Sequence, residues 1–116
     1  MKLIDYSDVP PTRFENDAAK GVLGRVVIGQ KDGAAHFCMR VFEVAPGGHT
    51  PRHIHDWEHE IFFHAGAGEI YGQGMWHPAG AGSVVFVPAN EEHQIRNTGT
   101  KPLIFVCLIP SGVPEL

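Results

Sequence analysis

Short runs of apolar and β-branched residues, separated by turn residues, recur along almost the whole chain. Fourteen glycines and nine prolines divide the chain at short intervals, and such residues favour turns between regular elements. The runs between the turns are rich in strand-forming residues, and they cover 22–28, 35–44, 60–64, 69–71, 84–87, 93–97 and 103–109. No helical periodicity extends beyond about two turns. The pattern therefore predicts an all-β sandwich or barrel of many short antiparallel strands.

Two of the predicted strands, 84–87 and 103–109, are apolar on both faces. A strand of a small antiparallel barrel normally alternates between inward apolar and outward polar residues, so the outer face of this barrel needs a cover. A second copy of the chain is one such cover, and it predicts a two-fold symmetric homodimer. The alternative cover is the N-terminal segment, residues 1–21, which precedes a core barrel at about 22–110.

Composition and charge restrict the classes of function. Hydrophobic residues make up 43% of the 116 residues and charged residues 19%, which predicts one folded domain over 1–116. A formal charge of −4 without a lysine- or arginine-rich run argues against nucleic acid and anionic membranes as partners. The apolar runs are shorter than the roughly 20 residues of a membrane span, and the N-terminus lacks a signal-peptide pattern. We therefore expect a cytoplasmic protein with a small-molecule ligand or substrate.

Four histidines in two clusters carry the clearest chemical signal. His53, His55 and His59 lie within a short segment, and His93 stands alone much later in the chain. Imidazole is the most common side-chain ligand for transition metals. His53 and His55 are two residues apart, so both rings leave the same face of a strand. This pair can hold one metal ion only if the chain folds back to supply further ligands.

The residues around these histidines resemble both sequence motifs of the cupin superfamily. In the first motif, a glycine is followed after five residues by His-x-His, and then by a further ligand and a second glycine. In the second, a glycine precedes a proline, a histidine and an asparagine at fixed spacing. The residues that fit these positions are Gly47, His53, His55, Gly66, Gly82, Pro88, His93 and Asn97. The resemblance covers about residues 36–109, and it implies an antiparallel jelly-roll β-barrel with a metal inside its mouth.

Two positions need interpretation within this resemblance. Asn90 stands where the second motif has its central glycine, and asparagine tolerates a left-handed backbone better than other non-glycine residues. Small cupins with a similar histidine-rich segment have four histidine ligands, which implies His53, His55, His59 and His93 here. Glu60 is the alternative to His59, since many cupins place a glutamate in that position. Four further histidines match no motif position, and we expect none of them to bind the metal: His36, His49, His64 and His77.

A site of four neutral imidazoles suits one divalent transition metal per chain, which is Mn, Fe, Cu, Ni or Zn. An octahedral ion would keep two positions open, as catalytic metal sites do. Because many metal cupins are dioxygenases, the resemblance implies a metal-dependent oxygenase that acts on a small organic molecule. A non-catalytic module that binds a small ligand or senses metal is one alternative. A metal-dependent isomerase or decarboxylase is the other.

Strand parity identifies candidate residues for the pocket beside the metal. Phe105, Cys107 and Ile109 share one face of the predicted strand 103–109. Arg40 lies on an otherwise apolar face of the strand 35–44, where its charge needs a partner. That partner is either a substrate carboxylate or oxyanion, or a nearby acidic residue. Trp57 either lines the pocket or packs at an interface. Cys107 is either an oxidisable or weakly ligating thiol, or a small core residue.

Overall fold

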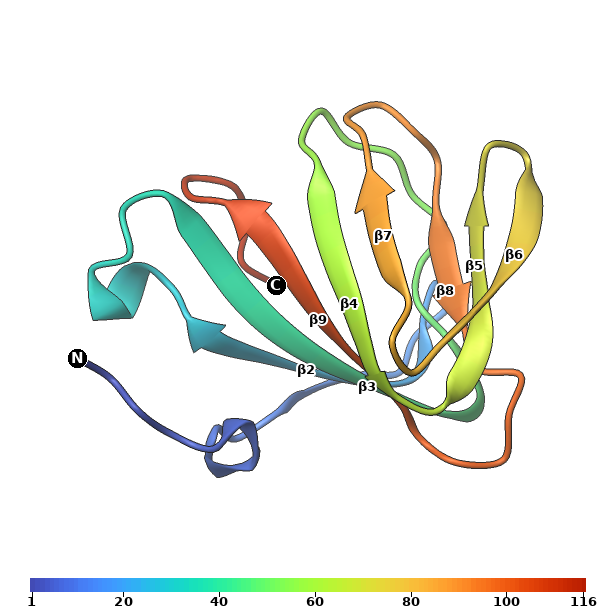
Figure 1. Cartoon of the computed structure of the whole chain (residues 1–116), viewed down its shortest axis with the longest axis horizontal. Coiled ribbons are helices and arrows are strands. Elements are labelled where there is room, and N and C mark those ends of the chain that lie inside the picture. Colours follow the sequence, from blue (N-terminus) through green and yellow to red (C-terminus); the bar gives the residue numbers. More distant parts are fainter.

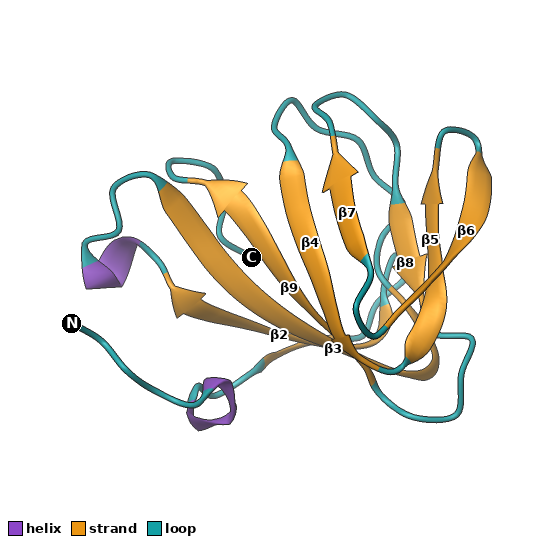
Figure 2. Cartoon of the chain, in the orientation of Figure 1, coloured by secondary structure: helices purple, strands orange, loops and turns teal.

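The protein is described from a computed structural model of all residues 1–116, and it is built from nine strands (Figures 1 and 2). The strands are β1 (Thr12–Phe14), β2 (Lys20–Ile28), β3 (Phe37–His49), β4 (His59–Ala65), β5 (Ala67–Gly72), β6 (Met75–Gly80), β7 (Val84–Val87), β8 (Gln94–Arg96) and β9 (Leu103–Pro110). The two helical segments, η1 (Tyr6–Asp8) and η2 (Gln30–Asp32), are single 3-10 turns. Neither has the length or the apolar composition that crossing a membrane requires.

All strands belong to one curled antiparallel sheet in the order β6-β5-β8-β3-β9-β4-β7, and β2 joins β3 and carries β1. The long strand β3 connects the two halves of the sheet. Its first part pairs with β9, whereas His49 at its end pairs with Arg96 of β8. The sheet therefore bends around β3 into the partly closed jelly-roll barrel seen in Figure 1. The predicted all-β fold is confirmed.

The predicted strand 35–44 ends too early, because residues 46–48 lie inside β3, which continues to His49. Gly47 has a φ of 78°, in the left-handed region that glycine adopts without strain. A Cβ atom on Gly48 would lie 2.5 Å from the carbonyl oxygen of Lys20, so β2 passes too close for a side chain. The two glycines thus let β3 bend while it continues from one half of the sheet to the other.

The concave face of the sheet forms the hydrophobic core. Strand β9 is apolar throughout, yet its burial alternates, and Leu103, Phe105, Cys107 and Ile109 are each at most 3% exposed. These residues belong to a core of 14 buried side chains, together with Ala19, Val22, Cys38, Val44, Ile61, Phe63, Ile70, Ala79, Val87 and Ile95. The core fills the closed part of the barrel and holds the strands that reach the histidine cluster.

The convex face of the sheet stays partly uncovered. Phe62, Val84 and Phe86 lie on the outer face of β4 and β7, and they are 47%, 80% and 58% exposed. The N-terminal segment covers the other end of this face, where the guanidinium of Arg25 donates to the carbonyl oxygen of Val9 over 2.8 Å. The segment therefore accounts for the β2 side only, and the apolar patch on β4 and β7 has no cover within the chain.

Asn97, which occupies the last position of the second motif, joins three parts of the backbone. Its buried side chain donates to the carbonyl oxygens of Val44 and Lys101, and it accepts from the N–H of Gly99, over 2.7–2.8 Å. We expect Asn97→Ala to lower the free energy of unfolding by about 2–3 kcal/mol, because it leaves buried polar groups without partners. Urea denaturation measures this, and an unchanged midpoint would contradict it. Asn90→Gly is the control, and it should change stability by less than about 0.5 kcal/mol.

Candidate metal centre

Backbone hydrogen bonds hold the two histidine segments together. His53 and His93 form an isolated antiparallel bridge, in which each N–H donates to the carbonyl oxygen of the other residue over 3.1 and 3.0 Å. Asn90 adopts the expected left-handed backbone, with a φ of 66°, and its N–H donates to the carbonyl oxygen of His55 over 2.7 Å. The turn of the second motif is therefore attached directly to the His-x-His segment of the first.

The structure brings His53, His55, His59 and His93 into one cluster, in which the candidate ligand nitrogens all lie within 4.8 Å of one another. The rings of His55 and His59, and those of His53 and His93, have centroids 4.6 Å apart. An imidazole-bound transition metal has bonds of about 2.1 Å, which places opposite ligands about 4.2 Å apart. Small movements of the rings would therefore bring all four nitrogens to bonding distance, and the cluster can hold a metal ion.

Carbonyl oxygens of the backbone fix the orientation of two of the rings. His55 Nδ1 lies 2.9 Å from the carbonyl oxygen of Trp57, and His93 Nδ1 lies 2.8 Å from that of Glu91. A carbonyl oxygen only accepts, so Nδ1 carries the proton in both rings and Nε2 is left as the bare nitrogen. His93 Nε2 is buried and has no hydrogen-bond partner. Such an unpartnered nitrogen, aimed at three other imidazoles, fits a metal ligand.

The third ligand candidate of the first motif is His59, and Glu60 points away from the cluster. His59 is buried at the start of β4, whereas Glu60 is exposed beside Phe86 on the outer face. His59 Nδ1 lies 3.2 Å from the sulfur of Cys107 and 3.3 Å from Nη2 of Arg40. When His59 Nε2 is bare, its proton is on Nδ1, and the sulfur of Cys107 is then the acceptor within reach.

The cluster keeps its imidazoles neutral at ordinary pH. Desolvation is the largest cause, and it lowers the pKa of His59 to about 3 and that of His53 to about 4. The positive charge of Arg40 and the neighbouring imidazoles lower both pKa values further. The pKa values of His55 and His93 are also lowered, again mainly by desolvation. Neutral imidazoles are the form that binds metals.

These lowered pKa values predict how the metal-free protein responds to acid. The histidines of the unfolded chain bind protons below about pH 6.5, while His53 and His59 of the folded cluster stay neutral to about pH 4. Acid therefore favours the unfolded state, and the free energy of unfolding should fall as the pH is lowered through that window. Urea denaturation of chelator-treated protein measures this. His59→Gln should show a shallower pH dependence, and equal slopes for the two proteins would contradict the prediction.

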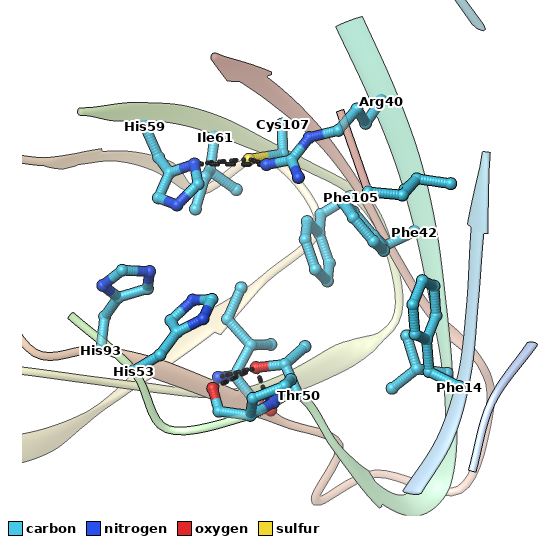
Figure 3. A pocket seen from close by; sticks show the side chains of 14 residues that line it. Phe14, Arg40, Phe42, Thr50, His53, His59, Ile61, His93, Phe105 and Cys107 are labelled. Atoms are coloured by element: carbon cyan, nitrogen blue, oxygen red, sulfur yellow. Dashed lines mark hydrogen bonds between the residues drawn. The ribbon is translucent and has the colours of Figure 1, made fainter. Parts of the chain in front are cut away.

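Three histidines of the cluster, His53, His59 and His93, line one side of a cavity of about 250 Å³, whereas His55 does not line it (Figure 3). Arg40 is the only charged side chain on the cavity wall apart from the titratable histidines. The rings of Phe42 and Phe105 stack with centroids 5.4 Å apart and form the apolar side of the cavity. The remaining lining residues are Phe14, Val22, Thr50, Pro51, His53, His59, Ile61, His93, Ile95, Cys107 and Leu116.

The structure separates the five candidate pocket residues into two groups. Arg40, Phe105 and Cys107 line the cavity beside the histidines. Ile109 is buried in the core and does not line it. Trp57 does not line the cavity either. Its ring stacks on the ring of His55 at 4.2 Å with an angle of 5° between the planes, so it packs against a ligand candidate.

Some lining residues have no signal in the sequence pattern. Phe14 belongs to the three-residue strand β1, inside a segment that we considered only as a cover for the outer face of the barrel. Leu116 reaches the cavity because the chain after β9 folds back over the sheet, where a Cβ on Gly24 would lie 3.1 Å from its Cδ2. Four further histidines lie outside the cluster, as expected: His36, His49, His64 and His77.

The comparison with known families agrees with this fold and cluster. Residues 40–109 match the profile of the family described as the cupin domain. The chain belongs to the cupin family, whose members bind small-molecule ligands and metals.

Individual relatives differ in what their names say they do. The structure of the polyketide cyclase RemF from Streptomyces resistomycificus has a TM-score of 0.90 and 33% identity, covering 98% of this chain and 82% of that one. The oxalate-binding protein of Thermotoga maritima is 32% identical and covers 92% of each chain. Auxin-binding protein 1 of Arabidopsis thaliana is 31% identical over 90% of this chain and 57% of its own length. Membership of the family therefore leaves the reaction open.

Proposed function

We propose that this protein is a metal-dependent enzyme that closes a ring in a small, largely apolar and oxygen-bearing organic molecule. The observation that carries this proposal is the position of the histidine cluster, because His53, His59 and His93 line a cavity that is otherwise mainly apolar. Eight of the 14 lining residues are hydrophobic, and aromatic rings face the histidine cluster across the cavity. A flexible apolar chain fits such a lining better than a small, fully polar substrate does.

The residues of the cavity would act mainly by positioning. Phe42 and Phe105 would hold the apolar chain folded and exclude water, and this lowers the entropy cost of bringing two of its carbons together. The neutral rings of His53 and His93 would hold a divalent transition metal at the oxygen-bearing part of the substrate. The metal, when bound, supplies Lewis-acid polarisation of a carbonyl oxygen. The structural similarity to the cyclase RemF, with a TM-score of 0.90 over 98% of this chain, supports ring closure as the reaction.

A metal-dependent oxygenase is the second candidate, and the donor set is the observation that favours it. Four nitrogen ligands leave two positions of an octahedral ion free, which is enough for a substrate and dioxygen. The two candidate reactions differ in what they consume and release. Ring closure by condensation forms a carbon–carbon bond and releases water without dioxygen, whereas an oxygenase consumes dioxygen.

The test supplies the protein with a synthetic linear poly-β-ketone after loading with Zn²⁺, Mn²⁺ or Fe²⁺. Ring closure predicts a product that has lost water, seen by mass spectrometry, with no oxygen uptake at an electrode. The double variant His53→Ala, His93→Ala should abolish the product, and His77→Ala should not. Oxygen uptake without ring closure would replace the proposal by the oxygenase. Bound metal without turnover of any kind would leave a ligand-binding protein and contradict both.

We also propose that the exposed patch of Phe62, Val84 and Phe86 packs against a second copy of the chain. The patch is apolar, it lies on a sheet face, and the N-terminal segment does not reach it. Light scattering at micromolar concentration should give twice the chain mass for the wild type and the monomer mass for Phe86→Glu. Met75→Glu, at the exposed start of β6, is the control and should stay dimeric. A monomeric wild type would contradict the proposal.

A further inference from the structure

We propose that Arg40 binds the anionic end of the ligand, so that the cavity selects an aromatic or apolar molecule carrying a carboxylate or an enolate. The inference rests on the proposed function for the identity of the cavity as the substrate site. It adds the class of substrate and the residue that recognises it.

The first argument is that the charge of Arg40 has no partner. Arg40 is only 9% exposed, and the ion pairs of the chain are Lys2–Asp32, Arg25–Glu43 and Arg96–Glu69. Arg25 makes an instructive comparison, because it is equally buried and does have a carboxylate partner. A buried charge without a counter-charge is costly in a folded protein. Arg40 bears that cost, because no acidic side chain of the chain forms an ion pair with it.

The hydrogen bonds of Arg40 lead to the same conclusion. Nη2 lies 3.0 Å from the sulfur of Cys107 and 3.3 Å from Nδ1 of His59, while Nη1 reaches only the carbonyl oxygen of Glu115 at 3.4 Å. Nε is buried and has no partner. All the partners are neutral groups, and the contact of Nη1 is long for a hydrogen bond. A carboxylate would satisfy the planar guanidinium better, because it accepts two parallel N–H bonds.

The position of Arg40 defines where the ligand would lie. Its guanidinium lies beside His59 and Cys107 at one side of the cavity, as Figure 3 shows, and its Cζ is 5.0 Å from the centroid of the Phe42 ring. Phe42 in turn stacks on Phe105. An anionic group between Arg40 and the histidines therefore leaves the rest of the ligand against the aromatic wall.

The charge of the cavity adds a further argument. No aspartate or glutamate side chain lines it, and Arg40 is the only side chain on its wall with a permanent charge. A divalent metal at the histidine cluster would raise the positive charge further. An anion is the ligand that such an environment attracts. A small dianion fits the cavity less well than a larger anion with an apolar part, because it would leave the phenylalanine rings of the lining uncovered.

The test uses metal-free protein, so that its outcome is independent of metal chemistry. Titration calorimetry compares cinnamate with cinnamamide, which share a shape and differ in charge, and oxalate serves as a small polar anion. We expect cinnamate to bind at least about tenfold more tightly than either cinnamamide or oxalate, because it alone offers Arg40 a carboxylate and covers the apolar wall. Arg40→Met should remove the preference over cinnamamide and keep cinnamamide binding. Arg25→Met, on the outer face, should keep the preference.

Equal affinity for cinnamate and cinnamamide in the wild type would overturn the inference, and so would a preference that survives in Arg40→Met. A crystal of the wild type with 4-bromocinnamate gives a second readout that needs no variant. The carboxylate should lie within hydrogen-bond distance of Arg40, and a carboxylate directed to solvent would count against it. Failure of these tests would leave ring closure untouched, whereas failure of the turnover assay would leave this binding result intact.

Discussion

Removal of a single cluster histidine should nearly abolish metal binding. Chelator-treated wild-type protein, dialysed against Zn²⁺ or Mn²⁺, should take up one ion per chain by elemental analysis, and His93→Ala should bind it at least about 100-fold more weakly. The estimate follows because even loss of a residue that only orients a ligand costs about 10–100-fold in metal affinity. His93 is a ligand candidate with a buried, unpartnered nitrogen, so its loss should cost more.

His77→Ala is the matched control for this experiment. His77 lies outside the cluster, and its Nε2 is engaged with the carbonyl oxygen of Gly72 at 3.1 Å. The control removes the same chemical group and should leave metal affinity unchanged. Equal loss in both variants would mean that binding follows general histidine content, and it would contradict a defined site at residues 53, 55, 59 and 93.

Truncation of Phe63 should give the largest loss of stability among single core substitutions. Phe63 has no exposed surface, and its ring packs against Phe105 with centroids 5.4 Å apart. Phe63→Ala removes a whole ring from the centre of the core, and such changes cost about 3–5 kcal/mol. Urea denaturation of metal-free protein measures the loss without a contribution from metal binding.

Phe37→Ala provides the comparison for Phe63→Ala. Phe37 is 67% exposed at the start of β3, so the same truncation should cost less than about 1 kcal/mol. A similar loss in the two variants would mean that the concave face of the sheet is not the main core. The barrel would then not be rigid enough to hold the histidines in place.

Much of the fold could be predicted from the sequence, and the exceptions have physical reasons. Seven strands were visible as apolar or β-branched runs, but β1 has only three residues, and β6 contains Pro78 and no regular alternation. β1 pairs with β2 and β6 pairs with β5, and these tertiary contacts stabilise both strands. The strand propensity of the local sequence does not reveal such contacts. The predicted strand 35–44 stopped before the bend in β3, because glycine favours turns between strands as well as bends within a strand.

The candidate site was predicted better than the residues around it. The motif spacing identified His53, His55 and His93, and the resemblance to small cupins with four histidine ligands favoured His59 over Glu60. The structure brings these four histidines together, and Glu60 points away from them. Trp57 does not line the cavity, its ring is stacked on His55, and its packing at an interface stays a prediction. The lack of an acidic partner for Arg40 depends on distant strands, so no local pattern could reveal it. The dimer and the reaction stay predictions.

The most direct test of the account is an anomalous difference map from crystals of metal-loaded protein, with data collected at the absorption edge of the metal. We predict one peak per chain, at bonding distance from Nε2 of the four clustered histidines. The metal ion at this peak should face the cavity that Arg40 and Phe105 line. A peak elsewhere on the chain would contradict the account, and so would four clustered imidazoles with no peak among them after loading.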